Sequence, residues 1–137
     1  MKTTNIGVIG CGFYAQNHLH AWKDLEIKGA SLAAVCDLDQ DKAKAAGEKF
    51  GTPWYTDVDE MLDHEKIDLV DIVTQMHSHR HLAAITSARK IATIVQKPLA
   101  QHLDECVEIV ENAVAHPGPT RACTRTLARA RGRSRAC

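Results

Sequence analysis

Short apolar runs alternate with segments of helical periodicity along the first 116 residues. Strands are expected at five of these runs, residues 5–10, 30–36, 54–55, 67–73 and 91–95. Helices are expected in the segments that follow them, at residues 13–27, 40–50, 57–63, 78–89 and 101–116. Strands joined through helices pair in parallel, because each helix returns the chain to the starting edge of the sheet. The pattern therefore predicts an α/β fold, a doubly wound parallel sheet with helices on both faces.

Local signals indicate where several of these helices begin and end. Asp57 and Glu60 have the spacing of a capping box, and Ser78 is expected to cap the fourth helix. Arg89 and Lys90 would close that helix, because cations suit its negative end. The last helix is expected to bury one apolar stripe, made of Leu103, Cys106, Val107, Val110, Ala113 and Val114.

The net charge of zero hides a sharp division of the chain. Residues 1–116 hold 11 basic and 17 acidic side chains, whereas residues 117–137 hold six arginines and no acidic residue. We therefore expect one domain over residues 1–116 and an Arg-rich, disordered tail over residues 117–137. The tail composition is typical of GC-rich coding DNA read out of frame, which predicts a frameshifted or truncated product. The alternative is a basic tail that binds nucleic acid or another anionic surface.

A glycine-rich turn, GCGFYA, lies directly between the first expected strand and the first helix. Gly10 permits the tight turn, Gly12 lets a pyrophosphate approach the backbone, and the small Ala15 allows close helix–strand packing. This arrangement is typical of the Rossmann fold, which binds NAD or NADP. A tight turn without a ligand is the alternative interpretation.

The residues around this turn are expected to complete the dinucleotide site. The phosphates would lie on the amide groups of Phe13 and Tyr14, at the positive end of the helix, and Cys11 is expected to bind the cofactor beside them. Asp37 ends the second strand, and its carboxylate can accept hydrogen bonds from the adenosine ribose and repel a 2′-phosphate. Leu38 follows it on the same cofactor-binding segment. We therefore expect NAD rather than NADP, although Asp37 alone could also be a helix cap.

Two further motifs follow the next long strands, where ligands bind in open parallel sheets. TQMHSH spans residues 74–79, and QKP spans residues 96–98. Together with the glycine turn, they resemble the Gfo/Idh/MocA family of glucose–fructose oxidoreductases and inositol dehydrogenases. Members of that family read T-P-x-x-x-H and E-K-P at these places. The resemblance covers residues 4–116 and departs from the pattern at Gln75, Lys90 and Gln96.

The resemblance implies a dehydrogenase that transfers a hydride between NAD and a sugar or cyclitol hydroxyl. It implies a nicotinamide-side contact for four residues, Thr74, Gln75, Met76 and His79. Gln96 would hydrogen-bond a ribose, and Lys97 would be the catalytic lysine that reaches both the substrate hydroxyl and the nicotinamide ribose. The family's second α/β domain, with its D-x-x-x-H pair, has no counterpart in the sequence. The chain alone is therefore expected to be inactive, and a cofactor-binding module without turnover is the alternative function.

The remaining chemistry-bearing residues are interpreted more simply. His77, His79 and His81 lack the spacing and partners of a metal site, so no metal is predicted. His18 and His20 are interpreted as surface or packing residues of the first helix. The five cysteines form no CxxC pair and no segment is long enough to span a membrane, which favours the cytoplasm. Without a sixth strand, residues 91–95 would form an apolar edge open to self-association.

Overall fold

The computed structural model describes residues 3–116, so the expectations for the tail at 117–137 lie outside the described residues. Five strands are present: β1 (Thr4–Ile9), β2 (Ala30–Cys36), β3 (Trp54–Tyr55), β4 (Leu69–Ile72) and β5 (Ala92–Val95). The helices are α1 (Ala15–Asp24), α2 (Gln40–Phe50), α3 (Val58–His64), α4 (Met76–Ala88) and α5 (Leu103–Ala115). A short 3-10 helix, η1 (Leu25–Lys28), continues α1. Every expected element is present, and its ends either coincide with the expected ones or are displaced by at most three residues.

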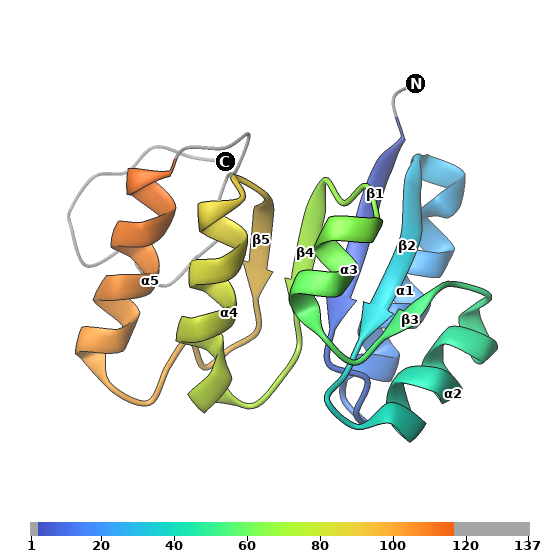
Figure 1. The fold of residues 1–137 in the computed structure, drawn as a ribbon, viewed down its shortest axis with the longest axis horizontal. Coiled ribbons are helices and arrows are strands. Elements are labelled where there is room, and N and C mark those ends of the chain that lie inside the picture. Colours follow the sequence, from blue (N-terminus) through green and yellow to red (C-terminus); the bar gives the residue numbers. More distant parts are fainter. Residues whose placement is uncertain (1–2, 117–137) are drawn as a thin grey trace.

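The strands form one parallel sheet in the order β3-β2-β1-β4-β5. The chain first moves outward from β1 to β3 and then crosses back to β4 and β5, which is the doubly wound topology. The direction changes between β1 and β4, whose carboxyl ends lie side by side at the lower edge in Figure 1. This switch point is where open parallel sheets bind ligands.

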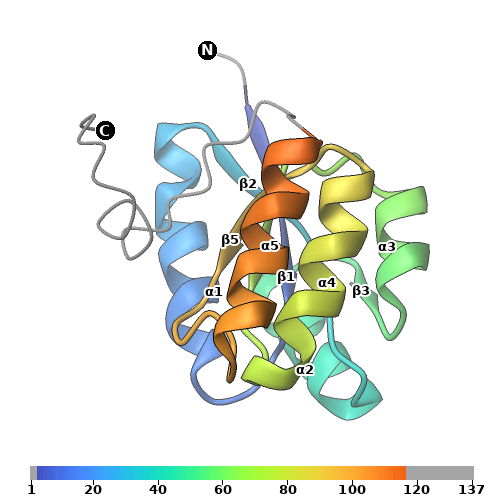
Figure 2. The ribbon, with the colours of Figure 1, turned by 90° about the vertical axis from the view of Figure 1, so that its left-hand side faces the viewer.

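Right-handed crossovers place the helices of the two halves on opposite faces of the sheet. Figure 2 shows α1 on one side, with α3 and α4 on the other. The α1 face buries Ile6, Val8 and Leu19, which pack with Phe50 of α2. The opposite face packs Met61 of α3 and Leu82 of α4 against the sheet, together with Ile9, Ala34, Cys36, Val70 and Ile72. Neighbouring residues of a strand point to opposite faces of the sheet, and both faces are covered by helices. The strand sequences are therefore continuous apolar runs.

Helix ends follow the expected chemistry except in α4. Asp57 caps α3 by accepting the backbone N–H of Glu60 at 2.8 Å, as its position predicted. The expectation that Ser78 caps α4 is wrong, because α4 already begins at Met76 after the extended Gln75. Ser78 lies inside the first turn, and its hydroxyl donates to the Gln75 carbonyl at 2.8 Å. The chain therefore enters the helix two residues earlier than the capping signal suggested.

The predicted buried stripe of α5 is also partly wrong. Ile109 is the buried residue of this helix, whereas Leu103 and Val114 are 75% and 73% exposed. The reason is that α5 packs mainly against α4, its partner in Figures 1 and 2, instead of lying flat on the sheet. Apolar side chains on the outer side of α5 consequently face solvent. Among residues 3–116, no helix has both the length and the apolar character needed to cross a bilayer.

Candidate functional site

The turn after β1 approaches the end of β4 so closely that only glycine fits at its first position. Gly10 has φ +102°, and a Cβ on it would lie 2.3 Å from the carbonyl oxygen of Val73. Its backbone N–H donates to the carbonyl of Cys36 at 2.8 Å, which anchors the turn to β2 as well. Gly10 is therefore required by the fold, whether or not a ligand is present.

Gly12 has a different role. A Cβ on Gly12 would meet nothing within 4 Å, so its lack of a side chain leaves open space at the crevice. The helix that follows begins at Ala15, and no side chain caps its start at Tyr14. The first turn of α1 also holds no acidic residue, which leaves its positive end available to an anion. This open, uncapped turn fits the pyrophosphate of a dinucleotide.

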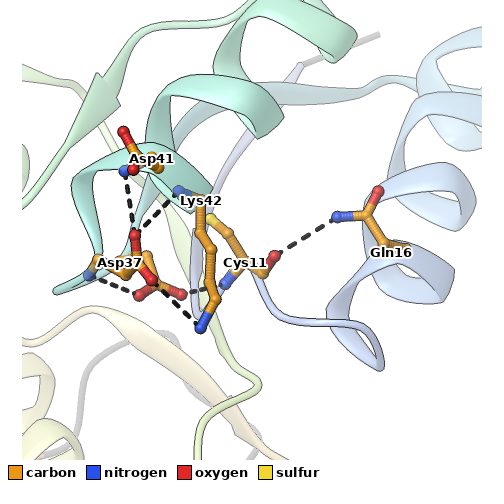
Figure 3. Close-up of polar contacts among 6 residues, drawn as sticks. Cys11, Gln16, Asp37, Asp41 and Lys42 are labelled. Atoms are coloured by element: carbon orange, nitrogen blue, oxygen red, sulfur yellow. Dashed lines mark hydrogen bonds and ion pairs between the residues drawn. The ribbon is translucent and has the colours of Figure 1, made fainter.

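Asp37 joins the end of β2 to the glycine turn, as Figure 3 shows. One carboxylate oxygen accepts the backbone N–H of Cys11 at 2.7 Å, and the other accepts that of Asp39 at 2.9 Å. Asp39, in turn, caps α2 by accepting the N–H groups of Asp41 and Lys42. The helix-cap interpretation therefore applies to Asp39. Asp37 instead faces the turn, where a ribose would lie beside the pyrophosphate.

The side chains around Asp37 differ in their solvent exposure. Phe13 and Leu38, both expected to contact cofactor, are 95% and 93% exposed at the open edge of the crevice. Cys11 is buried, and burial, with a smaller contribution from Asp37, raises the pKa of its thiol to about 12. A thiol with that pKa stays protonated at neutral pH, which makes Cys11 a weak nucleophile. Its backbone N–H, bonded to Asp37, is its contribution to the site.

The segment after β4 is tied down by a buried histidine. His79 lies in the second turn of α4, with Nε2 3.0 Å from the carbonyl oxygen of Thr74 and Nδ1 3.0 Å from that of Leu99. The Thr74 hydroxyl pairs with that of Ser78 at 2.6 Å. His79 thus links the loop after β4 to the loop after β5. Its contact with cofactor stays a prediction, as do those of Thr74, Gln75 and Met76.

Lys97 follows β5 in an exposed turn whose Lys97–Pro98 peptide bond is cis. The backbone N–H of Lys97 donates to Oε1 of Gln96 at 2.7 Å, and Nε2 of Gln96 lies 2.9 Å from Nε2 of His18. The structure therefore brings Gln96 and Lys97 to the same edge as the glycine turn. Their roles toward ribose and substrate stay predictions.

His18, Trp22 and Asp71 form a polar group that sequence reasoning missed. Asp71 is a buried residue of β4. Its Oδ2 atom lies 2.8 Å from Nδ1 of His18 and accepts the Nε1–H of Trp22 at 2.7 Å. His18 is half-buried and bonded, so its interpretation as a surface or packing residue was incomplete. The available signal was the acidic Asp71 inside an otherwise apolar strand, since a buried charge requires partners. Within residues 3–116, the acidic, His and Cys side chains form no group of three that could hold a metal ion.

The sequence of this domain matches a known family along nearly all of its described length. The family model of the Gfo/Idh/MocA proteins, an oxidoreductase family with an NAD-binding Rossmann fold, matches residues 4–119. The chain belongs to the Gfo/Idh/MocA family. It carries the NAD-binding Rossmann domain of these oxidoreductases, and the resemblance seen in the sequence is confirmed.

Named members of the Gfo/Idh/MocA family are similar over the same region. D-apiose dehydrogenase from Paraburkholderia graminis is 43% identical over 104 residues, which are 75% of this chain and 27% of that protein. Inositol 2-dehydrogenase 2 from Saccharopolyspora erythraea is 32% identical over 110 residues, 80% of this chain and 32% of that protein. The chain therefore spans about a third of the length of the curated relatives it matches.

Solved structures show the same fold. An oxidoreductase from Agrobacterium radiobacter, in complex with NAD⁺, L-tartaric acid and magnesium, superposes with a TM-score of 0.83. It is 36% identical in sequence, and the match covers 91% of this chain and 36% of that one. The WlbA dehydrogenase from Bordetella pertussis, at 21% identity and a TM-score of 0.82, shares the fold.

The two glycines of the turn give a matched pair of substitutions. We expect Gly10→Ala to lower the free energy of unfolding by at least about 2 kcal/mol, because the methyl group collides with a backbone carbonyl at positive φ. Gly12→Ala should leave the thermal midpoint unchanged but weaken NADH binding, because its methyl group occupies the open space. Thermal unfolding and fluorescence titration with NADH measure the two effects. Undiminished NADH affinity in Gly12→Ala would contradict the placement of the pyrophosphate at this turn.

Proposed function

We propose that the crevice at the carboxyl edge of β1, β2 and β4 binds NAD(H) and prefers it to NADP(H). The observation that carries this is the bond from the Cys11 N–H to Asp37, which holds a carboxylate beside the open turn at Gly12. A carboxylate in that place accepts from the two ribose hydroxyls of NAD and repels the 2′-phosphate of NADP. The uncapped start of α1 supplies the positive field for the pyrophosphate.

We infer further that this domain serves an oxidoreductase acting on a hydroxyl group of a sugar or cyclitol. The names of the relatives support this class, since they act on D-apiose or on inositol. Bound NAD would supply the hydride acceptor. Lys97 would hold or move the proton of the substrate hydroxyl, because it stands exposed at the same edge as the glycine turn. Gln96 and His79 would keep the two loops of this edge in place through their hydrogen bonds.

The first test is cofactor selectivity. We expect the unmodified chain to bind NADH more tightly than NADPH, and Asp37→Ala to narrow the ratio of the two affinities. Asp39→Ala is the matched control, because Asp39 caps α2 without facing the turn. It should cost about 1 kcal/mol of stability, as a lost N-cap does, and keep the selectivity. Equal affinities in the unmodified chain would refute the role given to Asp37.

The second test concerns turnover. We expect the 137-residue chain to bind NADH. With NAD and a panel of sugars and inositols as substrates, it should form no NADH. The described crevice leaves Lys97 exposed to water. Holding a substrate against its cofactor is worth ~7–11 kcal/mol of the barrier, and nothing in residues 3–116 encloses one. A rate well above background that disappears in Lys97→Ala would show the chain to be catalytically complete.

We also propose self-association through the β5 side of the molecule. In the part of the chain that the structure describes, β5 is an edge strand, and α5, which packs on α4 at this side of the molecule, exposes Leu103 and Val114. A second copy of the chain would pair with the free backbone groups of β5 and cover these side chains. We expect Leu103→Lys with Val114→Lys to shift sedimentation equilibrium toward the monomer. Ile27→Lys, at an exposed apolar residue of η1, is the control and should not shift the equilibrium.

A location in a reducing compartment, the cytoplasm, fits the cysteines of the domain. Cys11, Cys36 and Cys106 are all free thiols in the described residues, and the first two are buried in the core. Burial raises the pKa of the Cys36 thiol to about 12, as it does for Cys11. The two buried thiols therefore stay protonated at neutral pH and act as small apolar side chains of the core.

A further inference from the structure

A chain of hydrogen bonds runs from the interior of the sheet to Lys97. It begins at Asp71 of β4, whose side chain is 2% exposed. One of its carboxylate oxygens is 2.8 Å from Nδ1 of His18 and accepts the Nε1–H of Trp22 at 2.7 Å. The other oxygen is buried without a partner among residues 3–116. The two donors from α1 therefore provide the main compensation for burying this carboxylate.

The chain continues from His18 to the turn after β5. Nε2 of His18 lies 2.9 Å from Nε2 of Gln96, and Oε1 of Gln96 accepts the backbone N–H of Lys97 at 2.7 Å. Three elements that border the crevice are joined in this way: α1 behind the glycine turn, β4 at the switch point, and the turn that carries Lys97. The contacts span 78 residues of sequence between His18 and Gln96.

Donor and acceptor rules leave one protonation pattern that satisfies every group. The Lys97 N–H needs an oxygen, so the Gln96 amide must present Oε1 to it and its NH₂ group to His18. The NH₂ group is a donor, so Nε2 of His18 must carry no hydrogen and accept. The hydrogen of a neutral imidazole then lies on Nδ1, where it is donated to Asp71. A flipped Gln96 would instead place its NH₂ group against the Lys97 N–H, two donors at 2.7 Å.

We propose that His18 is a positioning residue for Lys97, held by Asp71 as the neutral Nδ1–H tautomer so that its Nε2 orients Gln96. Through Gln96, the buried carboxylate determines the conformation of the backbone at Lys97. This proposal rests on the proposed function only for the use made of Lys97; the tautomer and the network are properties of the unliganded chain. It also assigns a role to glutamine at position 96, where a carboxylate would demand a second hydrogen on His18.

The first experiment measures the tautomer directly. The full chain, labelled with ¹⁵N in its histidines, is examined by NMR at neutral pH without cofactor. We expect the His18 resonances to show a protonated Nδ1 and a hydrogen-free Nε2. In Gln96→Glu, which has nearly the same shape, both nitrogens should become protonated because carboxylates then face both sides of the ring. An Nε2–H tautomer or a doubly protonated ring in the unmodified chain would overturn the proposal.

The second experiment tests the connection to Lys97. His18→Asn keeps an N–H near the place of Nδ1, so Asp71 retains a donor, but it removes the ring nitrogen that meets Gln96. We expect this variant to remain folded, to shift the backbone amide resonance of Lys97, and to weaken NADH binding about fivefold, the contribution of one neutral hydrogen bond. His20→Ala, on the same helix but with its ring in edge-to-face contact with Phe50, is the matched control and should change neither.

The outcomes separate this proposal from the proposed function. If the tautomer and the Lys97 shift are as expected but no variant binds NADH, the proposed function fails and the positioning network stands. If NADH binds but His18→Asn leaves the Lys97 amide unchanged, the positioning role is refuted and the proposed function stands. If His18→Asn fails to fold, Gln96→Ala leaves Asp71 and His18 intact and must shift the Lys97 amide for the proposal to hold.

Discussion

The contact between the turn at Gly10 and the end of β4 is the constraint on which the site depends. A Cβ at Gly10 would be 2.3 Å from the Val73 carbonyl oxygen, so glycine at this position lets β1 and β4 lie side by side without strain. That pairing creates the switch point, because the chain winds away from it in both directions. It also brings the start of α1 and the start of α4 to the same edge of the sheet. The proposed NAD(H) site depends on this close contact between the turn at Gly10 and the end of β4.

Two buried or half-buried carboxylates then organise the edge from opposite sides. Asp37 holds the backbone of the glycine turn through Cys11, while Asp71 holds α1 through His18 and Trp22. The hydrogen bonds of both carboxylates join segments that are distant in sequence. A hydrogen bond from an N–H group to a carboxylate is stronger than one between two neutral groups. The first carboxylate remains near solvent and suits recognition of a ribose. The second carboxylate is buried and holds the residues that position Lys97.

The half of the domain that carries Lys97 is held less firmly than the half that carries the glycine turn. The residues of β5 are half-buried throughout, whereas β1 and β2 each bury four residues. The turn after β5 depends instead on polar ties, from His79 to Leu99 and from Gln96 to His18. These ties allow a strand at the edge of the described sheet to present a lysine in a defined place.

The sequence by itself determined the α/β class, the strand–helix order, the glycine turn and the choice of Asp37, because these depend on local periodicity and on residues close in the chain. Only the tertiary structure decided which side chains meet across the sheet. The start of α4, the buried side of α5 and the bonds of His18 depend on how elements pack, and no local pattern encodes them. Asp71 shows the difference most clearly. Its charge within an apolar strand signals that it has partners, but His18 and Trp22 become those partners only because α1 crosses the face of β4.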